Sequence, residues 1–291
     1  MRPVNVPSPT QNATRQNVEH YENFPVASWL CPPRLRPPIA AIYHFARTAD
    51  DLADEGDVTS AQRLAALAAY RADMTAVASG HPPSTRWAEV FEPLARQMAA
   101  FSLPSSLLAD LLDAFVQDVN KTERQEGYAD RTALIDYCQR SAAPIGRLLL
   151  HLYGVHDETS LARSDDICNA LQLVNFWQDL SLDLPRGRYY LPEDRCAQHG
   201  VTRAMLLAGR QTPEITRLVA EQVDWAEALM RSGAPLVHAV PGRAGWELRL
   251  VVQGGLRILD KIRRMHHASL VVRPRITSRD ALPMLARAVS M

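Results

Sequence analysis

The segment Leu171–Pro192, with the sequence LQLVNFWQDLSLDLPRGRYYLP, constrains this chain more than any other. Within it, Asn175, Asp179 and Asp183 recur every four residues, and on a helix this spacing places the three side chains along one face. Their neighbours are mostly leucine, valine and aromatic residues, so the polar stripe belongs to an otherwise apolar helix. Because polar groups are costly to bury unless they are paired, this stripe requires a partner elsewhere in the fold.

A second acidic cluster lies far upstream, where Asp50 and Asp54 are again four residues apart and Asp51 lies beside them. The alternative reading is a solvated helix end that also includes Glu55 and Asp57. Two features favour a cation-binding site over a solvated helix end. The cluster lies toward the C-terminal end of the predicted helix, where the macrodipole disfavours negative charge. The preceding sequence, IAAIYHFARTA, is too apolar for a surface helix, so a cation is expected to offset the acids.

Together the two clusters predict one electronegative cleft that holds divalent metal ions, with buried, paired carboxylates as the alternative. Oxygen ligands suit Mg²⁺, which keeps several waters and bridges to phosphates. Several Mg²⁺ ions between two acidic helices would hold a diphosphate and stabilise it as it departs from a carbocation. Aromatic faces attract cations, although core packing explains each aromatic residue better individually. The available aromatic residues are Phe24, Tyr43, Phe45, Tyr137, Phe176 and Trp177.

The charge balance argues against nucleic acid as a partner, since 32 basic and 32 acidic residues cancel. The four cysteines show no CxxC pairing, which favours free thiols in a reducing compartment over zinc or disulfides. The first residues lack the apolar stretch of a signal peptide, and no apolar run approaches the roughly 20 residues of a membrane-spanning helix. We therefore expect a cytoplasmic protein and leave contact with a membrane surface open.

Helical periodicity extends through nearly the whole chain, with no alternating strand pattern and no Gly-rich phosphate loop. The expected fold is all-α, with residues 1–18 as a flexible segment and residues 19–291 as a single domain. An interruption is expected at Pro144, because proline disturbs a helix interior. The expected helical segments are 20–31, 37–55, 59–79, 85–101, 104–121, 132–154, 160–184, 193–208, 213–232 and 243–268.

The last long helix contains the pair Gly254-Gly255. Each glycine costs a helix about 1 kcal/mol in intrinsic propensity relative to alanine. The pair therefore suggests a kink, or the close approach of a ligand or a neighbouring helix. The tail beyond this helix, VVRPRITSRD, carries basic residues.

From about His20 to about Arg275, the chain resembles the squalene/phytoene synthase family of head-to-head prenyl transferases. The motifs that carry the resemblance are AIYHFARTADDLADE, DYCQRSAAPIGRL and LQLVNFWQDLSLDLPRGRYYLP. The pattern NxxxDxxxD followed by RGRYYLP is the most specific of them. The resemblance implies an all-α isoprenoid-synthase fold with a central cavity between two Asp-rich helices, and Mg²⁺ as the cofactor.

Within the family, the stretches HYENFPVASWLCPPRLRPPIAAIYHFARTADDLADEGD, AFVQDVNKT and YCQRSAAPIGRLLLHLYG are most similar to the bacterial hydroxysqualene synthases of hopanoid biosynthesis. This similarity implies Mg²⁺-dependent ionisation of presqualene diphosphate, rearrangement of the cyclopropylcarbinyl cation and capture of water, giving hydroxysqualene and diphosphate. It also implies hand-off of substrate from a presqualene diphosphate synthase, and hand-off of product to an enzyme that reduces hydroxysqualene.

The resemblance further implies roles for individual residues. Arg47 matches an arginine that contacts diphosphate, and Tyr43 lies one turn earlier on the same face. Tyr137 matches a cavity tyrosine near the reacting carbons. Gln172 lines the same helix face as Asn175, Asp179 and Asp183, which we call the ladder. Tyr43, Tyr137 and Gln172 are therefore the expected catalytic residues. The expected metal ligands are Asp50, Asp51, Asp54, Asn175, Asp179 and Asp183. The expected substrate- and diphosphate-binding residues are His20, Asn23, Phe24, Arg47, Arg188 and Tyr189, with a structural role equally open for the last two.

Two departures from the family pattern bear on the reaction. Members that condense two prenyl diphosphates often carry His-Ser-Lys-Ser-Phe where this chain has His20–Phe24, so Glu22 stands in place of a diphosphate-binding lysine. Gly255 aligns with a diphosphate-contacting tyrosine. Both changes fit an enzyme that receives preformed presqualene diphosphate. The alternative is a presqualene diphosphate or squalene synthase that condenses two molecules of farnesyl diphosphate.

Further assignments stay open at this point. Glu22, Asn23 and Gln172 are candidates for holding the water that ends the reaction. Asp118 is either an acid behind the site or an ordinary surface residue. No nicotinamide site is recognisable, which agrees with water capture. Two alternative functions are a non-catalytic helical assembly factor and an all-α phosphohydrolase. The intact acidic clusters disfavour the first, and the apolar surroundings disfavour the second.

Overall fold

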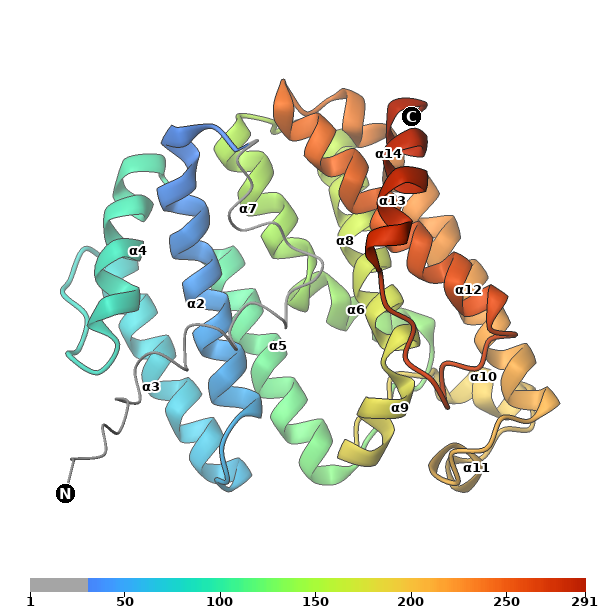
Figure 1. Ribbon diagram of the computed structural model, residues 1–291. Helices are drawn as coiled ribbons and strands as arrows, with labels where there is room; N and C mark the ends of the chain where they lie inside the picture. Colours follow the sequence, from blue (N-terminus) through green and yellow to red (C-terminus); the bar gives the residue numbers. More distant parts are fainter. Residues whose placement is uncertain (1–30) are drawn as a thin grey trace, which may run out of the picture.

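The computed structural model describes residues 31–291, and these residues form helices and loops without a β-strand (Figure 1). The predicted all-α, single-domain fold is confirmed. The expected helix at residues 20–31 lies outside the described residues except for Cys31. Within the described part of the chain, no helix is both long enough and apolar enough to cross a bilayer.

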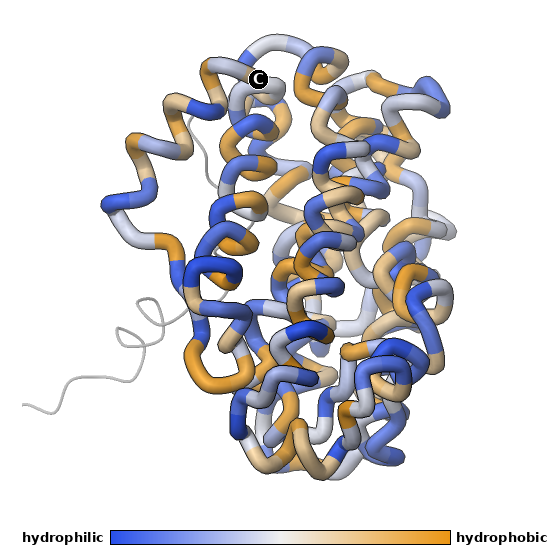
Figure 2. Tube along the Cα trace, turned by 90° about the vertical axis from the view of Figure 1, so that its right-hand side faces the viewer, coloured by the Kyte–Doolittle hydropathy of each residue, from blue (hydrophilic) through white to orange (hydrophobic). Residues whose placement is uncertain are grey.

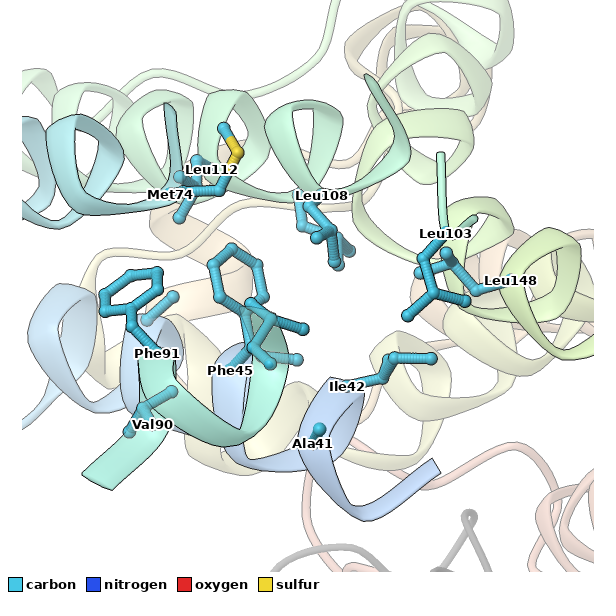
Figure 3. Close-up of a cluster of buried hydrophobic side chains, with 14 of the residues drawn as sticks. Ala41, Ile42, Phe45, Met74, Val90, Phe91, Leu103, Leu108, Leu112 and Leu148 are labelled. Carbon is cyan, nitrogen blue, oxygen red and sulfur yellow. The ribbon is translucent and has the colours of Figure 1, made fainter. Parts of the chain in front are cut away.

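The first four α-helices of the described residues pack around one apolar core. Aromatic rings fill its centre: Phe45 and Phe91 are fully buried, with ring centroids 6.1 Å apart (Figure 3). Local signals begin these helices, as where the Thr59 side chain accepts from the Gln62 N–H and the Gln62 side chain bonds back to Thr59. The helices are α2 (Arg36–Asp54), α3 (Ser60–Ala78), α4 (Ala88–Phe101) and α5 (Ser105–Arg124).

Two of the expected middle helices are interrupted. The segment 132–154 divides at Ala142, two residues before Pro144, because proline has no N–H for a helix interior and is tolerated in a first turn. The segment 160–184 begins earlier, where the Asp157 side chain accepts from the Ser160 N–H, and it breaks at Asp179. The resulting helices are α6 (Arg131–Ser141), α7 (Ala143–Tyr153), α8 (Glu158–Gln178) and α9 (Leu180–Asp183).

Of the remaining helices, the two longest pack directly against α8. The segment 193–208, expected as one helix, contains two short helices. A final helix, which the sequence did not predict, follows a long loop. Gly254-Gly255 does not end its helix. A Cβ on Gly255 would lie 2.6 Å from the Met230 Cε, so this glycine permits the close approach of neighbouring helices. The helices are α10 (Glu193–Gln198), α11 (Arg203–Leu207), α12 (Pro213–Gly233), α13 (Arg243–Arg264) and α14 (Ala281–Val289).

Within residues 31–291 there are also four short 3₁₀ helices, and one of them follows α9 directly. They are η2 (Pro33–Leu35), η3 (Leu184–Arg186), η4 (Ala234–His238) and η5 (Ser278–Asp280). In Figure 1 the C-terminal end of α2 lies in the lower half of the molecule, as do α9 and the end of α5. The helix α5 packs against both α2 and α6, and α6 packs against α8, so these helices surround one region.

Candidate functional site

The acids at the end of α2 gather around one arginine. Arg47 Nη1 lies 3.0 Å from Asp50 Oδ2, and Arg47 Nη2 lies 2.5 Å from Asp51 Oδ1 and 2.7 Å from Glu55 Oε1. Burial raises the pKa of Asp50 to about 7, and repulsion from the Asp54 carboxylate adds to the shift. One guanidinium is therefore not enough to neutralise this crowded cluster.

The ladder of Asn175, Asp179 and Asp183 keeps its four-residue spacing, although the helix breaks between α8 and α9. The N–H of Asp179 donates to the carbonyl of Asn175, and the N–H of Asp183 donates to the carbonyl of Asp179, both at 2.9 Å. The Asn175 side-chain amide also reaches Asp179 Oδ2 at 3.5 Å. Because these four-residue turns persist, the break at Asp179 leaves the three side chains stacked.

The two acidic clusters meet through Arg188. This arginine follows η3, is largely buried, and forms an ion pair with Asp54 at the end of α2. Burial opposes its charge, but the Asp54 and Asp183 carboxylates raise the pKa of Arg188 above its ordinary value. Burial raises the pKa of Asp183 to about 7, against the opposing effect of Arg188. Arg188 therefore lies within the electric field of both clusters, which form one site.

A second arginine reaches the ladder from the C-terminal part of the chain. Arg273 pairs with Asp179 through both Nε and Nη2, the latter 3.2 Å from Asp179 Oδ2. The loop that carries it is fixed beside the ladder, because the Gln178 side chain donates to the Pro274 carbonyl at 2.8 Å. The sequence did not predict this contact, since a basic tail gives no sign of which acid it will meet 94 positions away.

An aromatic cluster lies beside the acids. Tyr190 stacks on Phe176, with ring centroids 3.7 Å apart and an interplanar angle of 9°, and both rings lie near Tyr137. The Tyr137 hydroxyl donates to Asp118 Oδ2 at 2.5 Å. Burial raises the pKa of Asp118 to about 7. Asp118 is therefore part of the site environment and not an ordinary surface residue.

The tyrosine at this cluster is Tyr190, not Tyr189. The side chain of Tyr189 is buried beneath the Arg203 guanidinium, 4.0 Å from its ring centroid. The spacing Arg188-x-Tyr190-x-Pro192 within RGRYYLP was a signal that could have identified Tyr190. Two other expected aromatic residues, Phe45 and Trp177, are fully buried core residues. Core packing accounts for them.

The remaining predicted residues divide by position. Tyr43 on α2 and Gln172 on α8 are both half-buried, one helical turn or less from Arg47 and Asn175 respectively. His20, Glu22, Asn23 and Phe24 lie outside the described residues, so their predicted roles stay predictions.

An apolar cavity lies along the part of α8 that precedes Asn175. It encloses about 820 Å³, its open mouth included. Leu171 lines it one turn before Asn175, and Ile167 lines it one turn before Leu171, so the cavity and the ladder share a face of α8. Other residues that line it include Ile39, Leu149, Leu150 and Val251. The cavity suits a hydrocarbon chain whose polar end lies at the acids.

The chemistry of the acids fits a divalent cation. Carboxylate and amide oxygens are preferred ligands of Mg²⁺, and the raised pKa values of Asp50 and Asp183 reflect burial together with insufficient positive charge. Within residues 31–291, no three His, Cys, Asp or Glu side chains stand close enough to enclose an ion. Arginines occupy the carboxylates of Asp54 and Asp179 instead.

An all-α fold that combines two acidic clusters, paired arginines, aromatic rings and an apolar cavity has the features of an isoprenoid synthase. Comparison with known proteins agrees. The chain belongs to the squalene/phytoene synthase family, which residues 18–280 match. This family is of the divalent-metal-dependent isoprenoid synthase type.

Individual relatives narrow the comparison. The chain is 33% identical over 250 residues to a hydroxysqualene synthase of Sinorhizobium fredii, covering 85% of this chain and 80% of the relative. It is 32% identical to a presqualene diphosphate synthase of Rhodopseudomonas palustris, covering 65% of each. The crystal structure of squalene synthase HpnC from Alicyclobacillus acidocaldarius superposes with a TM-score of 0.77 at 36% identity, covering 88% of this chain and 93% of that one.

Proposed function

We propose that this protein is a hydroxysqualene synthase that ionises presqualene diphosphate and captures the rearranged cation with water. The observation that carries the proposal is the continuity of the two acidic clusters, held together by Arg188, with an aromatic cluster and an apolar cavity along α8. This arrangement accommodates an anionic head and a long hydrocarbon in one site. The similarity to relatives named hydroxysqualene synthase supports it.

We further propose Mg²⁺ as the metal, with Asp50, Asp51, Asp54, Asn175, Asp179 and Asp183 as its ligands. When bound, Mg²⁺ would supply charge neutralisation for the leaving diphosphate. The chain contributes the arginines. Arg47, Arg188 and Arg273 stand among the acids, and guanidinium forks bind phosphate oxygens well. When these arginines bind the diphosphate, the carboxylates that they now pair with would become available to the metal.

The aromatic cluster is proposed to stabilise the carbocation. Ring faces attract cations most strongly where water is excluded, and the buried Tyr137 ring lies among Phe176 and Tyr190. The hydrogen bond from Tyr137 to Asp118 fixes the tyrosine ring. Gln172 and Tyr43 are proposed to line the reacting region. In the final step, water would add its oxygen to the cation and release one proton, which the departed diphosphate would accept.

The alternative function is head-to-head condensation of two farnesyl diphosphates, which the similarity to a presqualene diphosphate synthase keeps in view. We also propose that residues 19–291 form one catalytic domain. The protein is proposed to be cytoplasmic and to act in hopanoid biosynthesis. In that setting a presqualene diphosphate synthase hands over the substrate, and an enzyme that reduces hydroxysqualene takes the product. His20, Asn23 and Phe24 are proposed to complete the substrate site.

One experiment separates the two reactions. Presqualene diphosphate and farnesyl diphosphate are offered separately with Mg²⁺ and no reductant, and the products are separated and identified. Hydroxysqualene from presqualene diphosphate alone supports the proposal. Presqualene diphosphate formed from farnesyl diphosphate, or squalene formed in a parallel assay only when a reductant is added, would overturn it. Asp54→Asn and Asp179→Asn variants serve as controls: each is expected to remain helical by circular dichroism and to lose turnover.

A further inference from the structure

The C-terminal part of the chain has an unusual charge. Residues 261–291 contain seven basic residues and one acidic residue, a net charge of +6 in a chain whose formal net charge is zero. The one acid, Asp280, is buried and pairs with Arg257 and Lys261. The exposed arginines of this segment include Arg264, Arg275 and Arg279. Acids outside the segment pair with three of its other arginines: Asp224 and Glu227 with Arg263, Asp179 with Arg273, and Asp260 with Arg287. The positive charge that the segment presents is therefore mainly that of Arg264, Arg275 and Arg279.

The last helix is also unusually apolar for its position. Eight of the nine residues of α14 are apolar, yet only Ala288 is buried. Leu282 is 79% exposed, Val289 is 67% exposed, and Leu285 lies between them on the same face. A helix that is apolar on nearly all sides is normally covered. Figure 2 shows α14 and the loop before it at the outer edge of the molecule, with one face of the helix turned away from the bundle.

The exposed apolar residues continue beyond this helix. Arg249 donates to the Ala288 carbonyl at 3.1 Å and lies over the ring of Trp246, which is half exposed. We use the name C-terminal apolar surface for Trp246, Leu282, Leu285 and Val289. Val271 and Val272, in the loop before α14, are also exposed. An exposed patch of this kind in a folded protein marks an interaction site.

We propose that the C-terminal apolar surface docks on an anionic lipid bilayer. Apolar side chains of α14 enter the interface, and the surrounding arginines meet negatively charged headgroups. The charge around this surface favours a bilayer over a second copy of the chain as the partner. A second copy of the chain would bring Arg264, Arg275 and Arg279 against the same arginines of its partner, whereas an anionic bilayer supplies the complementary charge.

Vesicle binding tests this surface directly. The protein is mixed with vesicles of phosphatidylcholine alone, or of equal parts phosphatidylcholine and phosphatidylglycerol, and the bound fraction is measured by co-sedimentation. Binding is expected only to the anionic vesicles, and 0.5 M salt should weaken it because screening shortens the range of the charges. The paired variant Leu282→Asp with Leu285→Asp should bind at least tenfold more weakly. Arg279→Glu should weaken binding severalfold.

Two matched controls separate this site from general surface effects. Leu207→Asp replaces a leucine of similar exposure on α11, and Arg96→Glu reverses an exposed arginine on α4. Both should bind vesicles as the unaltered protein does. Equal binding to neutral and anionic vesicles, or equal loss in the controls, would overturn the proposal. A dimer in sedimentation equilibrium that the paired variant dissociates, without vesicle binding, would assign the surface to a second copy instead.

Discussion

Arg188 forms an ion pair with Asp54 across 134 positions of the sequence, and this contact joins the two acidic clusters. The arginine follows the ladder helix, and the aspartate ends α2. Each cluster alone is a set of carboxylates at a helix end. The contact makes them one site with a guanidinium between them.

The first prediction concerns the shape of the Arg188 side chain. Arg188→Lys keeps the charge but loses the planar fork, so we expect kcat to fall roughly 10- to 100-fold, from the ~1.5–3 kcal/mol of a hydrogen bond between charged groups. Arg186→Lys, two residues earlier and exposed, is the matched control and should keep normal turnover. Steady-state kinetics with presqualene diphosphate measures both. Equal rates for Arg188→Lys and the unaltered enzyme would contradict the assignment.

The second prediction concerns competition at Asp179. The Arg273 guanidinium occupies the carboxylate that the proposed metal needs, so Arg273→Gln should raise Mn²⁺ affinity in the absence of substrate by roughly fivefold, about 1 kcal/mol. Electron paramagnetic resonance of free Mn²⁺ measures this affinity without turnover. Arg275→Gln, an exposed neighbour on the same loop, should leave the affinity unchanged. Weaker binding in the Arg273 variant would show that the arginine supports the metal site and does not compete with it.

The third prediction concerns pH. Burial raises the pKa of Asp118 to about 7 in the folded protein, whereas an unfolded aspartate titrates near 3.9. Between these values the folded state holds a proton that the unfolded state has released, so stability falls as pH rises through this window. Asp118→Asn removes this contribution, and the loss of Tm between pH 5 and pH 8 should become smaller. Thermal unfolding without metal at several pH values measures it, and an unchanged slope would refute the argument.

The fourth prediction compares two adjacent glycines in α13. A Cβ at Gly254 would meet only ordinary contacts, at 3.7 Å, so Gly254→Ala should stabilise the protein by about 0.5–1 kcal/mol. A Cβ at Gly255 would meet Met230 at 2.6 Å and Leu171 at 3.2 Å, so Gly255→Ala should gain less or destabilise. Urea unfolding of the two variants provides the comparison. A larger gain at Gly255 would contradict the close packing seen there.

Much of the site could be predicted from local spacing. Residues four apart on a helix identified Asn175, Asp179 and Asp183, and the same argument identified Asp50 and Asp54. The break at Asp179 could not be predicted, because the four-residue turns continue through it. Arg273 was missed for a different reason: its partner depends on how a long loop returns to α8. The helix α14 was missed because nine residues that include a proline give only a weak helical signal.

The ion pairs of Arg188 and Arg273 also have a consequence for how the protein is made. Many metal-binding proteins fold only when their ion is present, because the unpaired ligands repel one another. Here arginines pair with Asp54 and Asp179, so part of the repulsion among the acids is offset by the chain itself and folding is not expected to depend on the proposed metal. A chelator should therefore stop turnover and leave the helices intact.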